Sequence, residues 1–186
     1  MTTKSFAFGH DHLTVSIALG LLDHEIEGVL LPEILSRIRT SATLVEDIAG
    51  SDEVVYGINT GFGPLCNTRI SAKDTIRLQD NILRSHDVGV GEPITRHLSK
   101  LMLILKVHAL AKGFSGVSLR VVQRLLWFIN NDIIPVVPKQ GSVGASGDLA
   151  PLAHLVLPLI GLGKVWVAEE KIETATLYQQ HELQIR

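Results

Sequence analysis

Three glycines spaced three residues apart constrain the fold of this chain more than any other feature. Gly141, Gly144 and Gly147 lie in the stretch KQGSVGASGDLAPLAHL, residues 139–155, with serine and alanine among the residues between them. Glycine tolerates backbone conformations that other residues avoid, so the stretch predicts a tight turn that leads into the apolar, helix-like segment after it. A flexible linker is disfavoured, because apolar segments flank the stretch closely.

The spacing of these glycines does not match the common motifs for phosphate binding or nucleophilic catalysis. No lysine follows them as in GxxxxGK[ST], and the GxGxxG spacing of dinucleotide sites is absent. Ser142 and Ser146 both miss the GxSxG spacing of a nucleophile elbow. Taken alone, the residues favour a tight turn before a helix.

The triplet Ala145-Ser146-Gly147 permits a further reaction of the backbone itself. In a sharply bent chain, the nitrogen of Gly147 can approach the carbonyl carbon of Ala145, because glycine has no side chain and alanine has a small one. Loss of the Ser146 hydroxyl as water would leave an exocyclic methylene on a five-membered, electrophilic ring. Asp148 follows directly and can help to move protons.

Composition indicates one globular domain over residues 1–186, with 46% hydrophobic residues to form a core. A mean hydropathy of +0.27 is high for such a length and suggests apolar surface meant for other chains or for further sequence. The net charge of -2 makes nucleic acid and acidic membranes unexpected partners. One cysteine, a polar N-terminus and short apolar runs predict a cytoplasmic protein without disulfides or membrane spans.

Apolar residues recurring every three or four positions predict a mainly α-helical chain. The expected starting points of the helices are Pro32, Ser71, Thr95, Ser118 and Asp148. The helix after Thr95 contains the apolar run 101–105 and should therefore be central. Residues 164–173 predict a small β-hairpin, and Thr174 should start a last helix.

Two motifs resemble those of the aromatic amino acid ammonia-lyases and aminomutases. GSVGASGDLAPLAHL is similar to the family's signature, and YGINTGFG at 56–63 is similar to its catalytic tyrosine loop. Similarity continues through LQDNILRSHDVGVGEP and ALAKGFSG, so it extends from about Val54 to the hairpin. The resemblance implies the L-aspartase/fumarase-like helical fold. It also implies a 4-methylideneimidazol-5-one group (MIO) formed from Ala145-Ser146-Gly147, assisted by Asp148, with no external cofactor.

The resemblance assigns Tyr56 the removal of the β-proton of the substrate. A phenol can serve as this base once its pKa is lowered. Taken alone, Tyr56 would more often be a buried aromatic beside a turn. Asn59 and Gly63 of the same loop are expected to bind substrate, although Asn59 and Thr60 can instead satisfy the loop backbone.

Ser85-His86 indicates the substrate. By resemblance, histidine ammonia-lyases carry Ser-His at this place, whereas tyrosine- and phenylalanine-selective relatives carry His-Leu or Phe-Leu. An imidazole can hydrogen-bond the ring of L-histidine, which leucine cannot do. The alternative is a helix histidine satisfied by a neighbour. The other histidines lack metal-ligand spacing, so no metal site is expected, and Cys66 is interpreted as a packed side chain.

The family implied by these motifs has much longer members, so the chain is expected to correspond to their N-terminal part. The C-terminal helical bundle, the carboxylate-binding arginine and the remaining parts of the homotetramer's shared active sites would then be absent. Two hypotheses follow: part of a carbon–nitrogen lyase that converts L-histidine to trans-urocanate and ammonia, the first step of histidine catabolism, or a truncated and inactive chain. A lyase or aminomutase for another aromatic amino acid is a further alternative.

Overall fold

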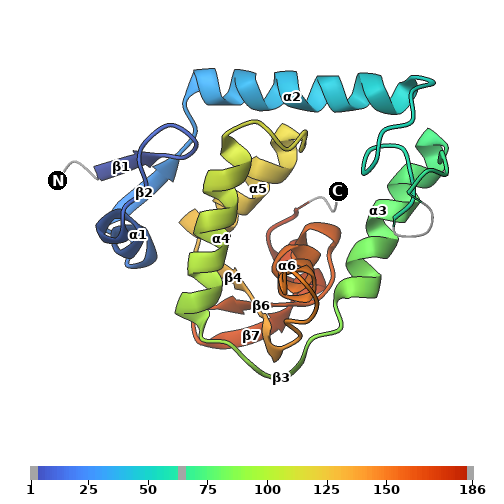
Figure 1. Ribbon diagram of the computed structural model, residues 1–186. Coiled ribbons are helices and arrows are strands. Elements are labelled where there is room, and N and C mark those ends of the chain that lie inside the picture. Colours follow the sequence, from blue (N-terminus) through green and yellow to red (C-terminus); the bar gives the residue numbers. More distant parts are fainter. Residues whose placement is uncertain (1–3, 63–65, 184–186) are drawn as a thin grey trace.

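The computed structural model describes residues 4–62 and 66–183, and its described part is mainly helical, as predicted (Figure 1). The helices are α1 Val15–Leu22, α2 Pro32–Gly50, α3 Ala72–His86, α4 Arg96–Ala111, α5 Leu119–Asn130, α6 Leu149–Val156, the 3-10 helix η2 Leu157–Ile160, and α7 Thr174–Gln180. The strands are β1 Lys4–Ala7, β2 Ile26–Val29, β3 Val90–Pro93, β4 Ile133–Pro135, β5 Pro138–Gln140, β6 Lys164–Val167 and β7 Glu170–Glu173.

Three helices begin where the sequence predicts, for local reasons. α2 starts at Pro32, whose missing N–H would have had no partner in the first turn. At the start of α3, the Asp74 N–H donates to Ser71 Oγ at 3.2 Å, and the Ser71 hydroxyl donates to the Asp74 carboxylate at 2.6 Å. At α4, the Leu98 N–H donates to Thr95 Oγ1 at 3.3 Å. These caps satisfy amides that the helix itself leaves without partners.

Two further predicted starts are confirmed in position but lack a capping bond from the side chain. α5 begins directly after Ser118 and α6 directly after Asp148, yet neither side chain accepts a hydrogen bond from its helix. Asp148 has φ −104° and ψ −11°, outside the extended conformation that usually directs a cap side chain toward the first amides. The start of α6 therefore depends on the turn that precedes it.

α4 and α5 form the centre of the core, and α2 lies across their ends (Figure 1). Leu103, Ile104 and Val107 of α4 and Leu125 and Phe128 of α5 are all fully buried. Burial of each such side chain stabilises the fold by roughly 2 kcal/mol. The prediction that α4 is central is confirmed, although its Leu105 is exposed on the outer side.

Small sheets join segments that are distant in the sequence. The predicted hairpin is confirmed, since β6 and β7 pair antiparallel with Trp166 opposite Lys171. Strand β4 adds to the other edge of β6, with Ile134 opposite Trp166. The parallel pair β1–β2 and the antiparallel pair β3–β5 were not predicted, because strands of three or four residues are too short to show an alternating pattern.

Candidate functional site

Residues 144–147 form a tight turn between β5 and α6, as the glycine spacing predicts. Gly144 has φ +89° and Gly147 has φ +71°, a left-handed conformation that side chains rarely adopt. Ala145 and Ser146, between them, are exposed. The Ser146 hydroxyl is therefore carried at the tip of a bent backbone, open to solvent.

The two left-handed glycines differ in the space around them. A Cβ atom built on Gly147 would lie 2.7 Å from Ser142 Oγ, whereas one built on Gly144 would meet nothing within 4 Å. Gly147 is therefore favoured by its conformation, and a side chain there would also force the Ser142 hydroxyl to move. The loop folds back so that the Ser142 hydroxyl packs against Gly147. The nitrogen of Gly147 is the one expected to attack the Ala145 carbonyl carbon.

The base of this loop is fastened to the segment that follows α3. Strand β5 pairs with β3, with Val90 opposite Gln140, and the Ile94 N–H donates to the Val137 carbonyl at 2.9 Å. A Cβ atom on Gly141 would lie 3.1 Å from the Cα atom of Gly89. We refer to residues 141–147 as the glycine loop. The structure thus brings the start of this loop against the backbone of Gly89, three residues after His86.

His86 is the last residue of α3 and is half-buried. Its Nδ1 lies 2.8 Å from the Ile82 carbonyl, one turn earlier, so Nδ1 carries the proton and donates it. The Ser85 hydroxyl donates to the same carbonyl at 3.1 Å. In this tautomer Nε2 keeps a lone pair that can accept a hydrogen bond, as from a substrate imidazole. The helix thus satisfies one ring nitrogen and leaves Nε2 able to accept a hydrogen bond.

Tyr56 is 63% exposed, so it is not the buried aromatic that its residue type alone would suggest. Its ring meets the ring of Phe62 edge-on, with 5.9 Å between the ring centroids. The following residue, Gly57, has φ +80° and open space beside it. The phenol hydroxyl is thus presented on a sharply turning loop that is free to contact a ligand. Gly63, also predicted to bind substrate, lies outside the described residues.

Asn59 lies at the centre of the Tyr56 loop and is only 1% exposed. Its Oδ1 accepts from the Val55 N–H at 2.9 Å, and its Nδ2 donates to the carbonyls of Glu53 at 2.7 Å and Ile48 at 3.3 Å. These bonds support the interpretation that Asn59 satisfies the loop backbone. Its contact with substrate stays a prediction.

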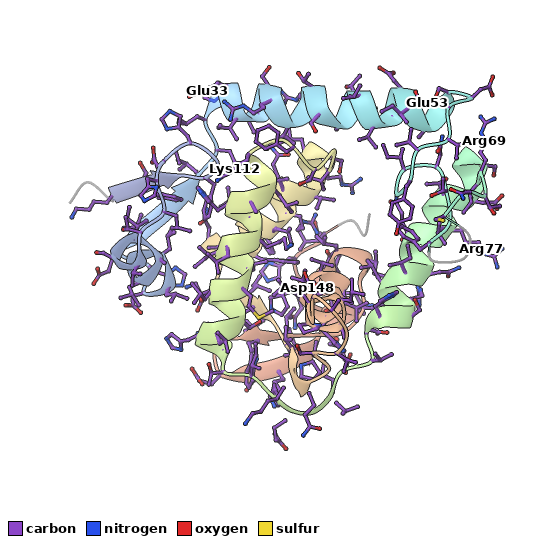
Figure 2. The ribbon with its side chains drawn as sticks, in the orientation of Figure 1. Glu33, Glu53, Arg69, Arg77, Lys112 and Asp148 are labelled. Atoms are coloured by element: carbon purple, nitrogen blue, oxygen red, sulfur yellow. The ribbon has the colours of Figure 1, made fainter. Side chains whose placement is uncertain are left out.

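The two predicted catalytic loops are connected to opposite ends of α3: the Tyr56 loop precedes its first turn, and the base of the glycine loop pairs with β3, the strand that follows its last turn. Asp148 is near the centre of the molecule beside α6, whereas Glu53 and Arg69, which flank the Tyr56 loop, lie at the far end of α2 (Figure 2). Within residues 4–62 and 66–183, no hydrogen bond joins the two loops directly. Helix α3 connects them, since it follows the Tyr56 loop in sequence and packs against α6.

One contact near the site was missed by the sequence analysis. The Gly89 N–H donates to Nε2 of His154 at 2.9 Å, and His154 belongs to the helix that follows the turn. In the sequence, His154 is distinguished only by its lack of metal-ligand spacing to other histidines. Its position four residues after Ala150, which is buried, could have placed it on the inner face of α6.

A charged cluster far from these loops serves the fold. Lys100, 2% exposed, contacts Asp132, which also pairs with Arg96 and His24. Burial raises the pKa of Asp132, but hydrogen bonds from His24, Lys100 and Arg96 outweigh this effect and lower it to about 2. The cluster ties α4 to the turns beside it.

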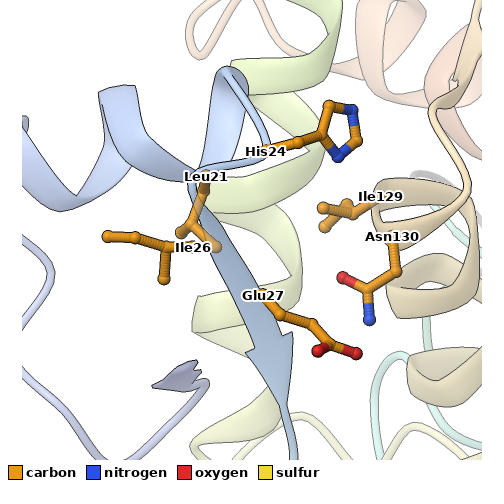
Figure 3. A pocket seen from close by; sticks show the side chains of 6 residues that line it. All are labelled: Leu21, His24, Ile26, Glu27, Ile129 and Asn130. Atoms are coloured by element: carbon orange, nitrogen blue, oxygen red, sulfur yellow. The ribbon is translucent and has the colours of Figure 1, made fainter. Parts of the chain in front are cut away.

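A small pocket of about 170 Å³ lies beside this charged cluster (Figure 3). Its lining residues are Leu21, His24, Ile26, Glu27, Ile129 and Asn130. The amide of Asn130 is committed to the backbone of Gly28, with bonds of 2.9 Å and 3.3 Å. Since the lining includes none of the predicted site residues, the pocket is not the candidate active site.

Neither a metal site nor a membrane span is found in the described ranges. Among residues 4–62 and 66–183, no three His, Cys, Asp or Glu side chains are grouped so as to hold a metal ion. The helices in the same part of the chain are all too short or too polar to cross a bilayer.

The chain is similar in sequence to a known enzyme family. A sequence model for aromatic amino acid lyases matches residues 13–185. A histidine ammonia-lyase of Streptococcus sanguinis is 40% identical over 156 residues, which cover 84% of this chain and 30% of that protein. The present chain therefore spans about a third of the length of the curated relatives it matches.

Solved structures agree with the sequence relatives. The histidine ammonia-lyase of Trypanosoma cruzi is 30% identical with a TM-score of 0.85, over 98% of this chain and 35% of that one. A tyrosine aminomutase of Streptomyces globisporus is 28% identical with a TM-score of 0.87, over 100% of this chain and 34% of that one. The fold of the chain is thus similar to that of both enzymes.

Proposed function

Because the chain belongs to the aromatic amino acid lyase family, we propose that it carries the ring-forming part of a histidine ammonia-lyase. The reaction is the elimination of ammonia from L-histidine to give trans-urocanate. The observation that carries this proposal is the Ala145-Ser146-Gly147 turn, whose base is paired with the segment just after Ser85-His86.

The turn fits the formation of MIO. The chain bends at two left-handed glycines, and the Ser142 hydroxyl occupies the place where a side chain of residue 147 would lie. The Gly147 nitrogen attacks the Ala145 carbonyl carbon, and one water leaves as the ring closes. The hydroxyl of the exposed Ser146 leaves with the α-proton as a second water molecule, and the neighbouring Asp148 assists the proton transfers. Once formed, the MIO methylene supplies an electrophile that makes the substrate amino group a better leaving group.

Further roles are proposed for other residues of this chain. Tyr56, on its exposed loop, removes the β-proton of the substrate as general base. His86 accepts a hydrogen bond from the substrate imidazole at Nε2, because its Nδ1–H is already held by Ile82. Ser85 shares that carbonyl and helps to orient the end of α3. Asn59 and Gly63, of the Tyr56 loop, are proposed to bind substrate.

A homotetramer and a cytoplasmic location complete the proposal. The family's active sites combine residues of several subunits, and the exposed Val143 and Leu149 beside the turn fit burial against further protein. The single cysteine, Cys66, is unpaired and fits a reducing compartment.

The decisive experiment measures intact mass and turnover together. Ring formation should lower the mass of the purified chain by two water molecules, and L-histidine should yield urocanate, followed by its near-ultraviolet absorbance. Ser146→Ala should retain the encoded mass and form no urocanate, because it has no hydroxyl to lose. Ser118→Ala is the control, since it removes a serine hydroxyl that makes no cap bond and lies outside the turn. An encoded mass for the unaltered chain, with no turnover, would favour the inactive-chain hypothesis.

An aromatic substrate other than histidine is the second candidate, favoured by the similarity to a tyrosine aminomutase. His86→Leu separates the two candidates, because it removes the imidazole while retaining an apolar side chain. Under the histidine proposal, this variant should lose at least about tenfold in kcat/KM for L-histidine. Unchanged preference among histidine, tyrosine and phenylalanine would contradict the assignment of His86.

A further inference from the structure

We propose that His154 is a positioning residue, which holds the MIO-forming turn against the substrate-selecting end of α3. The inference rests on the proposed function for the roles of Ala145-Ser146-Gly147 and Ser85-His86. Its geometry depends only on contacts among described residues. His154 acts through the backbone of Gly89 and contacts no reacting atom.

The first support is a hydrogen bond between segments 65 residues apart. The Gly89 N–H donates to Nε2 of His154 at 2.9 Å. Gly89 lies three residues after His86, and His154 lies in α6, whose first residue follows Asp148. One bond therefore connects the helix that leads out of the turn with the segment that leads out of α3.

The second support is the close packing around Gly89. A Cβ atom there would lie 2.9 Å from His154 Nε2 and 3.1 Å from the Cβ atom of Pro138, and Gly141 approaches its Cα from the loop side. Gly89 is therefore enclosed by α6, by β5 and by the start of the glycine loop. No larger residue fits this place without moving one of these three segments.

The third support is the form of the imidazole that this bond requires. Nε2 can accept the amide proton only when the ring is neutral and carries its own proton on Nδ1. Burial lowers the pKa of His154, while the nearby Asp87 raises it less strongly. The environment thus favours the neutral ring that the contact needs.

Three variants of the 186-residue chain test this role. His154→Leu removes the acceptor, whereas His154→Gln places an amide oxygen close to the former position of Nε2. The matched control is His108→Leu, because His108 Nδ1 also accepts from a glycine N–H, that of Gly9 at 3.3 Å, away from the loop. The measurements are amide hydrogen exchange at Gly89 and ¹⁵N relaxation of Gly144, Ala145 and Asp148, whose N–H groups remain whether or not the ring closes.

His154→Leu should lose about tenfold in protection at Gly89 and should increase the motion of Gly144, Ala145 and Asp148. His154→Gln should retain most of the protection, and His108→Leu should leave both measurements unchanged. If His154→Leu and His108→Leu changed the Gly89 protection and the motion of the turn equally, the effect would reflect only the overall stability of the fold, and the proposal would be overturned. An unchanged turn in a folded His154→Leu variant would also overturn it.

A measurement on the unaltered chain covers the case in which His154→Leu does not fold. The ¹⁵N shifts of His154 near neutral pH should show an Nδ1–H tautomer and a hydrogen-bonded Nε2. An Nε2–H tautomer there would overturn the proposal. None of these readouts needs turnover, so absence of urocanate refutes only the proposed function, whereas an unaltered turn in His154→Leu refutes only this inference.

Discussion

The Tyr56 loop and the glycine loop both carry predicted catalytic groups on sharply turning backbone, but they are held in opposite ways. The Tyr56 loop is organised from within, since the buried amide of Asn59 binds three backbone groups in and beside it. The glycine loop has exposed residues at its tip and is held at its ends, by β3, β5 and His154.

This difference suits the chemistry proposed for each loop. A general base must keep one orientation, and a buried amide at the centre of its loop fixes the backbone around it. A segment that cyclises must bring its own nitrogen onto its own carbonyl carbon, so a side chain bonded across its middle would obstruct the reaction. The glycine loop is therefore better fixed at its base than at its tip.

The largest effect is expected from removing the centre of the Tyr56 loop. Asn59→Ala leaves the Val55 N–H and the Glu53 carbonyl without their partner. The free energy of unfolding should fall by about 3 kcal/mol, measured by urea denaturation. Asn131→Ala is the control, because its exposed amide makes one bond, to the Trp127 carbonyl, and should cost less than about 0.5 kcal/mol. Equal losses would contradict the central role of Asn59.

A smaller loss in the free energy of unfolding is expected from substituting Gly144 or Gly147 of the glycine loop, and the two losses should differ. Gly144→Ala adds only backbone strain and should cost about 1 kcal/mol, since nothing lies near its Cβ position. Gly147→Ala adds the clash with Ser142 and should cost about 2 kcal/mol. Urea denaturation of both variants, and of Gly147→Ala combined with Ser142→Gly, measures the difference. If the second substitution restores nothing, the contact with Ser142 does not contribute.

The smallest effect is expected from pH at the base of the glycine loop. The pKa of His154 lies below 6.5 in the folded chain, mainly through burial, so folding favours the neutral ring. Its contribution to stability is fully present above pH 6.5 and is lost as pH falls through the folded pKa. Protection of the Gly89 amide, corrected for intrinsic exchange, should fall over that range. His154→Gln should remove this dependence, whereas a persistent fall would assign it to another group.

Local features of the fold were predictable because their causes lie within a few residues. The proline at the start of α2, the reciprocal hydrogen bonds between Ser71 and Asp74, and the glycines of the glycine loop each act on their immediate neighbours. The hairpin at 164–173 was predictable for the same reason. Asp148 marks the start of α6 correctly, although its side chain makes no cap bond.

The sequence by itself determined the starts of α2 to α7, the bend at Ala145-Ser146-Gly147 and the family motifs, since these depend on short-range sterics and residue identity. Only the tertiary structure decided that β3 pairs with β5, that Gly89 hydrogen-bonds His154 and that the Asn59 side chain hydrogen-bonds the backbone of its own loop. Those contacts arise when the packing of α3, α4, α5 and α6 brings distant backbone together. No residue within reach along the chain encodes which partner it will meet.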